Sequence, residues 1–172
     1  MKMRNKIIIT AAASGLLILL YLVIFRFSGQ DGEESGILSL YVSEKCVKIV
    51  NTISGKNWTE QMLDGMAKFF EHPLRKLAHF SEYACMGVLV CILWSPWLNR
   101  GKKLYFLTAA WVFLSAAADE FHQSFVPGRY CSFADVLLDT LGGSFGILIC
   151  IWCMKFYHLW QNWRGKSYGK KV

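Results

Sequence analysis

The sequence is poor in charge, and acidic residues are absent from both of its ends. Asp, Glu, Lys and Arg make up only 18% of its 172 residues, whereas hydrophobic residues make up 54%. So large an apolar fraction excludes an intrinsically disordered chain. The composition is also neither collagen-like nor that of a disulfide-dense secreted scaffold. A net charge of +7 suits a nucleic-acid partner in principle, but the positions of the charges point elsewhere.

Four stretches are long and apolar enough to cross a bilayer as helices, which takes about 20 mostly apolar residues. They are residues 7–25, 77–98, 104–126 and 133–154, and only the first has no ionisable residue. Residues 26–28 (Arg-Phe-Ser) offer no small-x-small cleavage site, so we interpret the first stretch as a retained anchor and not a signal peptide. The sequence therefore predicts an all-α membrane protein with four transmembrane helices.

The basic residues decide the expected orientation of these helices. Of the 19 basic residues, 11 lie in the two ends of the chain or in the turn at 99–103, where there is no acid. These eleven are Lys2, Arg4, Lys6, Arg100, Lys102, Lys103, Lys155, Arg164, Lys166, Lys170 and Lys171. Positive charge favours the cytoplasmic side, so both termini are expected to be cytoplasmic, and the loop at 28–75 and the turn at 127–128 to be extracellular. Charge placed in this way indicates a lipid bilayer as partner and no nucleic acid.

The first extracellular loop has its own pattern. Apolar residues recur at helical spacing from Leu38 to Ile53 and again from Met62 to Phe70, which predicts short amphipathic helices. Such helices lie on the outer leaflet or cap the bundle. The chain thus divides into four parts: a tail with the first transmembrane helix (1–27), the loop (28–75), a core with three transmembrane helices (76–155) and a basic cytoplasmic tail (156–172).

Ionisable residues stand at the expected outer ends of three spans, where they cost free energy unless they are paired or face water. Their spacing of three or four residues puts several of them on shared helix faces. Together they predict a small, outward-facing polar cavity, with these candidate ligand-binding residues: Lys76, His79, Glu82, Tyr83, Asp119, Glu120, Gln123, Arg129, Asp135 and Asp139. Gly142 and Gly146 continue the face of Asp135 and Asp139 one turn deeper, a small-xxx-small spacing that favours close helix packing.

Several uses of this cluster are open. Lys76 and Arg129 suit the recognition of a phosphate or carboxylate, because arginine presents a planar fork to such groups. A structural network of ion pairs is the plainer alternative. For an enzyme, His79 and Glu120 are weak candidates as acid and base, and no motif marks a nucleophile. The sequence has no HExxH motif, so we predict no metal and no cofactor, with a metal ion held by His79, Glu120, His122 and an aspartate kept as an alternative.

The six cysteines add little to this reading. Cys150 and Cys153 lie in an apolar helix near the reducing side, where a redox motif is not expected. Cys46 and Cys131 are both expected outside, where a disulfide between them is an open alternative.

The polar motifs resemble the signature of the VanZ-like family of small bacterial membrane proteins. The similar stretches are residues 75–83 (RKLAHFSEY) and 115–146, which holds Asp-Glu-Phe-His-Gln from Asp119, a Pro-Gly-Arg turn ending at Arg129, and then Asp135, Asp139, Gly142 and Gly146. Asp139 departs from the pattern, since the family is expected to carry Asn there. The resemblance implies a bacterial cytoplasmic membrane protein with a role in the cell envelope. The family is named after a protein linked to teicoplanin resistance, and no established reaction carries over.

Our leading hypothesis is therefore a VanZ-like membrane protein whose cavity binds an envelope component, such as a lipid phosphate or a cell-wall precursor, or a glycopeptide antibiotic. The alternatives are a membrane-embedded enzyme acting on a lipid-linked or peptide substrate, and a structural partner subunit. A transporter is less favoured because the four spans show no inverted repeat. The oligomeric state does not follow from the sequence.

Overall fold

A computed structural model describes residues 2–98 and 101–168, without the side chains at 158–159 and 161–168. Some residues of the charge argument fall outside this description: Arg100, Lys170 and Lys171 altogether, and the side chains of Arg164 and Lys166. The described part is entirely helical, with these elements: α1 (Met3–Ser28), α2 (Gly32–Ser54), α3 (Glu60–Trp94), α4 (Lys102–Gln123) and α5 (Phe133–Tyr168).

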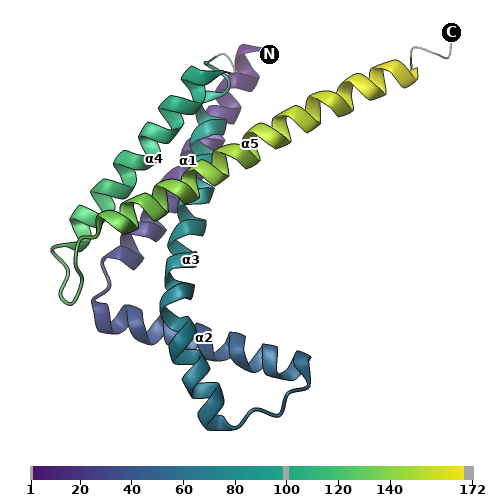
Figure 1. Cartoon of the computed structure of the whole chain (residues 1–172). Helices are drawn as coiled ribbons and strands as arrows, with labels where there is room; N and C mark the ends of the chain where they lie inside the picture. Colours follow the sequence, from purple (N-terminus) through teal and green to yellow (C-terminus); the bar gives the residue numbers. More distant parts are fainter. Residues whose placement is uncertain (1, 99–100, 169–172) are drawn as a thin grey trace.

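Four of these helices, α1, α3, α4 and α5, are long and apolar enough to cross a membrane. This confirms the predicted all-α class with four candidate spans. In α5 the apolar part is Phe133–Tyr157, and the helix continues away from the bundle (Figure 1). Large apolar side chains are exposed around the bundle, for example Leu22 at 61%, Phe106 at 73% and Leu148 at 63%. Such a surface suits lipid tails and would be unfavourable in water.

The second amphipathic segment of the loop differs from the prediction. It was expected as a short helix separate from a span that starts at residue 77, but α3 runs without interruption from Glu60 to Trp94. Thr59 caps its start by accepting a hydrogen bond from the Met62 backbone N–H, and Pro73 lies inside it. Proline removes one backbone donor but does not always end a helix. Hydropathy predicted only the second, apolar half of α3 as a membrane span. The helical hydrogen bonds, however, run through both halves of α3.

Helix α2 packs against the first half of α3, and the two together form an arm that extends from the bundle (Figure 1). Asp31 caps α2 by accepting a hydrogen bond from the Glu34 backbone N–H at 2.7 Å, and Gly55 ends it in the left-handed conformation, with φ 63°. The buried Ser43 hydroxyl donates to the Ala67 carbonyl of α3 at 2.7 Å, which ties the two helices together. We call α2 with residues 60–75 the arm.

The bundle core forms where α1, α3, α4 and α5 meet. Its buried residues are Leu17, Ile24, Tyr83, Met86, Val90, Val112, Ala116 and Val136. At one end of the bundle, Lys6 at the start of α1 lies 5.4 Å above the Trp97 ring, and the Trp97 indole N–H donates to Thr10 at 2.7 Å. The fold thus brings the basic start of the chain next to the turn before α4. The sidedness of this end in a membrane stays a prediction.

Helices α3 and α5 approach each other most closely through small residues. A Cβ atom added to Gly142 would meet the Phe80 carbonyl, and one added to Gly146 would meet the Ala84 carbonyl. Two further glycines that the sequence analysis did not single out are equally confined, since a Cβ on Gly87 would meet the Gly143 carbonyl. The small-xxx-small spacing therefore lies at a contact between backbones.

Candidate functional site

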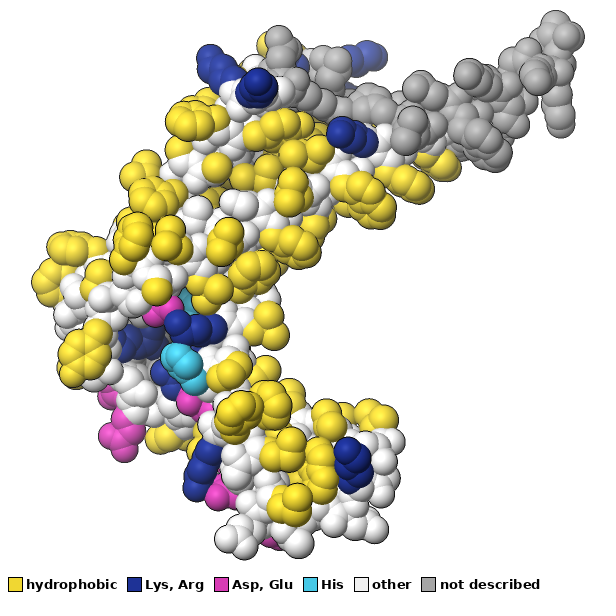
Figure 2. Space-filling view, in the orientation of Figure 1, with side chains coloured by type: hydrophobic (Ala, Val, Ile, Leu, Met, Phe, Trp, Pro, Cys, Tyr) yellow, Lys and Arg dark blue, Asp and Glu magenta, His cyan; other side chains and the backbone are white. Residues whose placement is uncertain are grey.

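The polar residues gather where the arm joins the bundle, around the ends of α1 and α4, the start of α5 and the middle of α3. Figure 2 shows Lys, Arg and His side chains in a hollow between the bundle and the arm, with apolar side chains on both sides of it. The fold thus places one polar region between two apolar surfaces.

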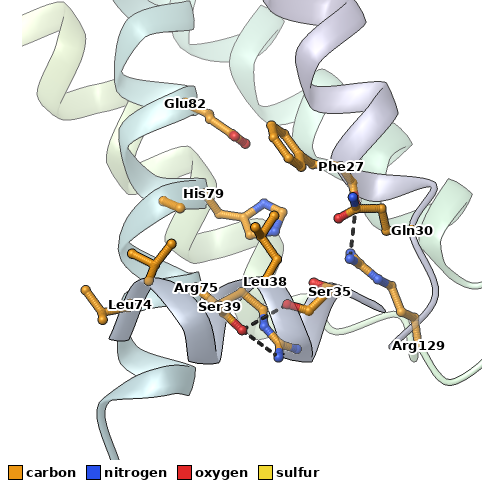
Figure 3. A pocket seen from close by; sticks show the side chains of 12 residues that line it. Phe27, Gln30, Ser35, Leu38, Ser39, Leu74, Arg75, His79, Glu82 and Arg129 are labelled. Atoms are coloured by element: carbon orange, nitrogen blue, oxygen red, sulfur yellow. Dashed lines mark hydrogen bonds between the residues drawn. The ribbon is translucent and has the colours of Figure 1, made fainter. Parts of the chain in front are cut away.

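Two cavities open in this region, and Arg75, His79 and Arg129 line both of them. The first, which we call the arginine cavity, has a volume of about 170 Å³ and is shown in Figure 3. Its other lining residues are Phe27, Gln30, Ser35, Leu38, Ser39, Val42, Leu74, Ala78 and Glu82. The second, the carboxylate cavity, has a volume of about 350 Å³. Its other lining residues are Gly32, His72, Lys76, Glu120, Gln123, Gly128, Tyr130, Ser132, Leu138, Asp135 and Asp139.

The carboxylate cavity thus collects seven of the ten candidate ligand-binding residues: Lys76, His79, Glu120, Gln123, Arg129, Asp135 and Asp139. Glu82 lies on the arginine cavity. Tyr83 and Asp119 line a different cavity, between α1, α3 and α4. The residues predicted from three separate stretches therefore lie in one region but do not share one cavity.

Two of the three cations in this region are neutralised by carboxylates. Lys76 forms an ion pair with Asp135 across α3 and α5, with 2.5 Å between Nζ and Oδ1. Arg75 forms an ion pair with Glu71 one turn earlier on α3, and its Nη2 also donates to the Ser39 hydroxyl of α2 at 3.2 Å. Arg75 therefore joins the two helices of the arm, α2 and α3. The sequence analysis did not single out Ser39 or Glu71, because each is an ordinary polar residue of an amphipathic helix.

Arg129 is the third cation, and its surroundings are different. Its Nη2 donates to the Phe27 carbonyl at the end of α1, at 3.1 Å (Figure 3), and within the described residues it has no carboxylate partner. Burial lowers the pKa of the Arg129 guanidinium, and repulsion by Arg75 acts in the same direction. Arginine nevertheless stays charged in proteins. Arg129 is thus a partly buried cation on the wall of both cavities, whose hydrogen-bond partner among the described residues is a neutral carbonyl, while Asp119, Glu120 and Asp31 attract it without an ion pair.

The turn before Arg129 is held against α2. The Gly32 backbone N–H donates to the Pro127 carbonyl at 3.1 Å, and Gly128 has a φ of 72° that favours glycine. A Cβ on Gly32 would meet the Gly128 carbonyl, so the two segments touch through their backbones. This contact sets the position from which Arg129 reaches the cavities.

A group of three side chains from three helices meets beside the cavities. His79 of α3, Asp119 of α4 and Asp139 of α5 each offer one nitrogen or oxygen atom, and these atoms all lie within 4.8 Å of one another. Gln123 donates to Asp119 at 3.1 Å and to the buried Ser28 hydroxyl of α1 at 3.3 Å. The sequence analysis kept His79, Glu120, His122 and an aspartate as alternative metal ligands, so it named His79 and the residue type of the other two but not Asp119 and Asp139 together.

Glu120 and His122 point to other partners. Glu120 is buried, and its carboxylate accepts a hydrogen bond from the Ser132 backbone N–H at 2.8 Å, which ties α4 to the segment before α5. The His122 ring lies 4.7 Å from the Phe25 ring of α1 and lines the cavity that holds Tyr83. Neither belongs to the group of three.

A second polar contact lies within the apolar spans. The Tyr21 hydroxyl of α1 lies 2.5 Å from the Ser115 hydroxyl of α4 and accepts a hydrogen bond from the Trp111 indole at 2.9 Å. The Tyr83 hydroxyl donates to the Ser115 carbonyl at 3.4 Å. The sequence analysis missed Tyr21, Trp111 and Ser115, although hydroxyl and indole groups inside an apolar helix are a signal for such contacts.

The cysteines Cys46 and Cys131, left open as a disulfide pair, are both exposed free thiols.

The long apolar helices with a polar region at one end define the class of this chain, a multi-pass membrane protein. More narrowly, the model of the VanZ/LLP1 family matches residues 14–155, and the chain belongs to that family. The resemblance noted in the sequence is thereby confirmed. No curated protein and no solved structure matches the chain. Family membership supports a VanZ-like protein related to the cell envelope or to antibiotic resistance.

Proposed function

We propose that this protein binds the phosphate-bearing headgroup of an envelope lipid at the arginine cavity. The observation that carries this proposal is Arg129, a partly buried guanidinium on the cavity wall with no carboxylate partner among the described residues. Asp119, Glu120 and Asp31 attract this guanidinium without forming an ion pair with it, so it has donors left for a bound anion. A guanidinium matches a phosphate in charge and in planar geometry, because it donates two parallel hydrogen bonds.

The walls of the cavity support a lipid as the source of the phosphate. Phe27, Leu38, Val42 and Leu74 line it together with the arginines, so a charged group and an apolar chain find suitable surfaces in one place. Small-molecule sites combine apolar walls with a few placed polar groups in this way. A free inorganic phosphate would leave the apolar walls unused.

The exposed apolar side chains of the arm support a location of the arginine cavity at the membrane surface. Ile37, Ile49 and Ile53 of α2 are exposed at 65%, 58% and 82%, and Phe69 of α3 is exposed at 73%. Amphipathic helices of this kind lie in the interface between headgroups and tails. With the expected orientation, in which both termini are cytoplasmic, this surface is the outer leaflet of a bacterial cytoplasmic membrane. A headgroup there would reach the cavity without crossing the bilayer.

The test is lipid binding by the detergent-purified protein, measured by native mass spectrometry. Phosphatidylglycerol and diacylglycerol, which has the same tails but no phosphate, are titrated against the wild type and the Arg129→Gln and Arg129→Lys variants. We expect preference for phosphatidylglycerol, at least about tenfold weaker binding in Arg129→Gln because a charged hydrogen bond contributes about 1.5–3 kcal/mol, and an intermediate loss in Arg129→Lys.

Lys68→Gln is the matched control, because it removes one positive charge from an exposed ion pair with Asp64 on the arm. It should leave binding unchanged. Equal affinity of the wild type for both lipids, or an Arg129→Gln variant that binds like the wild type, would overturn the proposal. Arg129-dependent binding of a glycopeptide antibiotic without binding of either lipid would move the site to that ligand class.

A further inference from the structure

The buried carboxylate of Asp139 has an unusual environment. The residue is 1% exposed, and neither of its oxygen atoms has a hydrogen-bond partner among the described residues. Asp135, one turn earlier on the same helix, pairs with Lys76 instead. A buried charge with no partner is strongly unfavourable, so Asp139 requires a compensating cation or a proton.

Two other ligand-type atoms face Asp139 from neighbouring helices. His79 and Asp119 each bring an atom into a group whose members lie within 4.8 Å of one another. The Nδ1 atom of His79 is also buried without a hydrogen-bond partner among the described residues. Asp119 is held by Gln123, as described above. Unsatisfied atoms of His79 and Asp139 therefore lie beside the carboxylate of Asp119, and the three groups come from three helices.

We propose that His79, Asp119 and Asp139 bind a divalent transition-metal ion of the Zn²⁺ or Mn²⁺ kind. One imidazole with two carboxylates is a donor set that these ions accept, whereas Mg²⁺ and Ca²⁺ prefer oxygen atoms alone. Ligand atoms bonded at about 2.0–2.2 Å to one ion lie about 3–4 Å apart, so small side-chain rotations complete the site. Three protein ligands leave a coordination position for water or another ligand.

The carboxylate cavity gives access to this site. His79 and Asp139 both line it, together with Arg129. An ion in that cavity would therefore meet two of the three ligands. The metal site shares His79 with the lining of the arginine cavity but does not use Arg129, which carries the proposed function. Metal binding and lipid binding are therefore separate claims and can fail separately.

The competing explanation is a proton. Two carboxylates close to each other can share one proton, which removes the charge without a metal. The two explanations make different predictions for the metal content of the protein and for the effect of metal on its stability. An ion that binds only the folded state raises the melting temperature, while a shared proton gives no dependence on metal.

The experiment uses the full chain purified in detergent, stripped with a chelator and then incubated with Zn²⁺ or Mn²⁺ before removal of free metal. Bound metal is counted by inductively coupled plasma mass spectrometry, and the melting temperature is measured with and without the ion. We expect about one ion per wild-type chain and a metal-dependent rise in melting temperature. The Asp139→Asn and His79→Gln variants should bind at least about tenfold more weakly and lose that rise.

Asp139→Asn also separates misfolding from loss of the ligand. Without metal it should melt at or above the temperature of the stripped wild type, because it removes an uncompensated buried charge. Asp64→Asn is the matched control, since it removes a carboxylate from α3 that lies in an exposed ion pair with Lys68 and outside the group of three. It should bind metal as the wild type does.

Two results would overturn the proposal. One is a wild type that holds less than about one tenth of an ion per chain and melts at the same temperature with and without Zn²⁺ and Mn²⁺, which favours the shared proton. The other is an Asp139→Asn variant that binds metal as tightly as the wild type. A wild type that binds metal but no anionic lipid would leave this site standing and remove the proposed function alone.

Discussion

Helices α3 and α5 meet in two different ways along their length. Around Gly87, Gly142 and Gly146 their backbones touch, and there is no room for a further side-chain atom. Nearer the start of α5 the same two helices are joined by the ion pair of Lys76 and Asp135, beside a cavity of about 350 Å³. The tight contact sets the position of α5, and the polar end depends on that position. The glycine part of the interface thus has a packing role, while the polar part has side chains that line a cavity and can bind a ligand.

The largest expected effect comes from a substitution in the tight contact. Gly146→Ala places a Cβ atom against the Ala84 carbonyl, which is backbone and cannot rotate away. We expect a loss of stability of about 1–3 kcal/mol, as in overpacked cores, measured by thermal unfolding in detergent. Gly15→Ala in α1 is the control, since a Cβ there meets nothing within 4 Å. If both variants were equally stable, the backbone contact between α3 and α5 would not matter for folding.

A smaller effect is expected at Glu120, in the polar region. Glu120→Ala leaves the partly buried Ser132 backbone N–H without its acceptor, which costs about 1 kcal/mol. Glu120→Gln keeps an acceptor oxygen and should lose less. The two variants are compared by thermal unfolding and by hydrogen exchange of the Ser132 amide. Equal losses in the two variants would mean that the carboxylate charge matters and not the hydrogen bond to Ser132.

The smallest effect is expected for the ion pair at the edge of the carboxylate cavity. Lys76 and Asp135 are exposed at 38% and 33%, so water screens their attraction. A double-mutant cycle with Lys76→Gln and Asp135→Asn should give a coupling energy of about 0.2–1 kcal/mol, as for other exposed pairs. A coupling of several kcal/mol would show that this pair, like the glycine contact, holds the helices together.

The sequence was most informative where one physical quantity decides the structure. A run of about 20 apolar residues has few alternatives to a transmembrane helix, because every backbone group must be satisfied within the segment. The four candidate spans were predicted for that reason. The expected start of the second span, near residue 77, does not coincide with the start of α3 at Glu60, since hydropathy reports burial in lipid and carries no information on where the hydrogen bonds of a helix begin or end. Thr59 and Gly55 mark the real boundary through their caps.

The polar region shows the same division at the level of single residues. Spacing along the helix predicted that Asp135 and Asp139 share a face, but it did not predict that the two carboxylates have different partners. In the structure Asp135 has Lys76 as partner, and Asp139 lies buried beside His79 and Asp119. Spacing likewise pointed to Gly142 and Gly146 but not to Gly87, since a lone glycine in one helix has meaning only once its neighbour Gly143 is known.

By itself the sequence determined the helical class, the four apolar spans and which charged residues share a helix face, because hydropathy and periodicity are properties of each segment alone. Only the tertiary structure decided which charges are neutralised and which are not. That Arg129 is held by the end of α1, and that three helices bring His79, Asp119 and Asp139 together, depends on contacts between segments that are distant along the chain. Electrostatic free energy depends on such distances, and a pattern within one helix does not contain them.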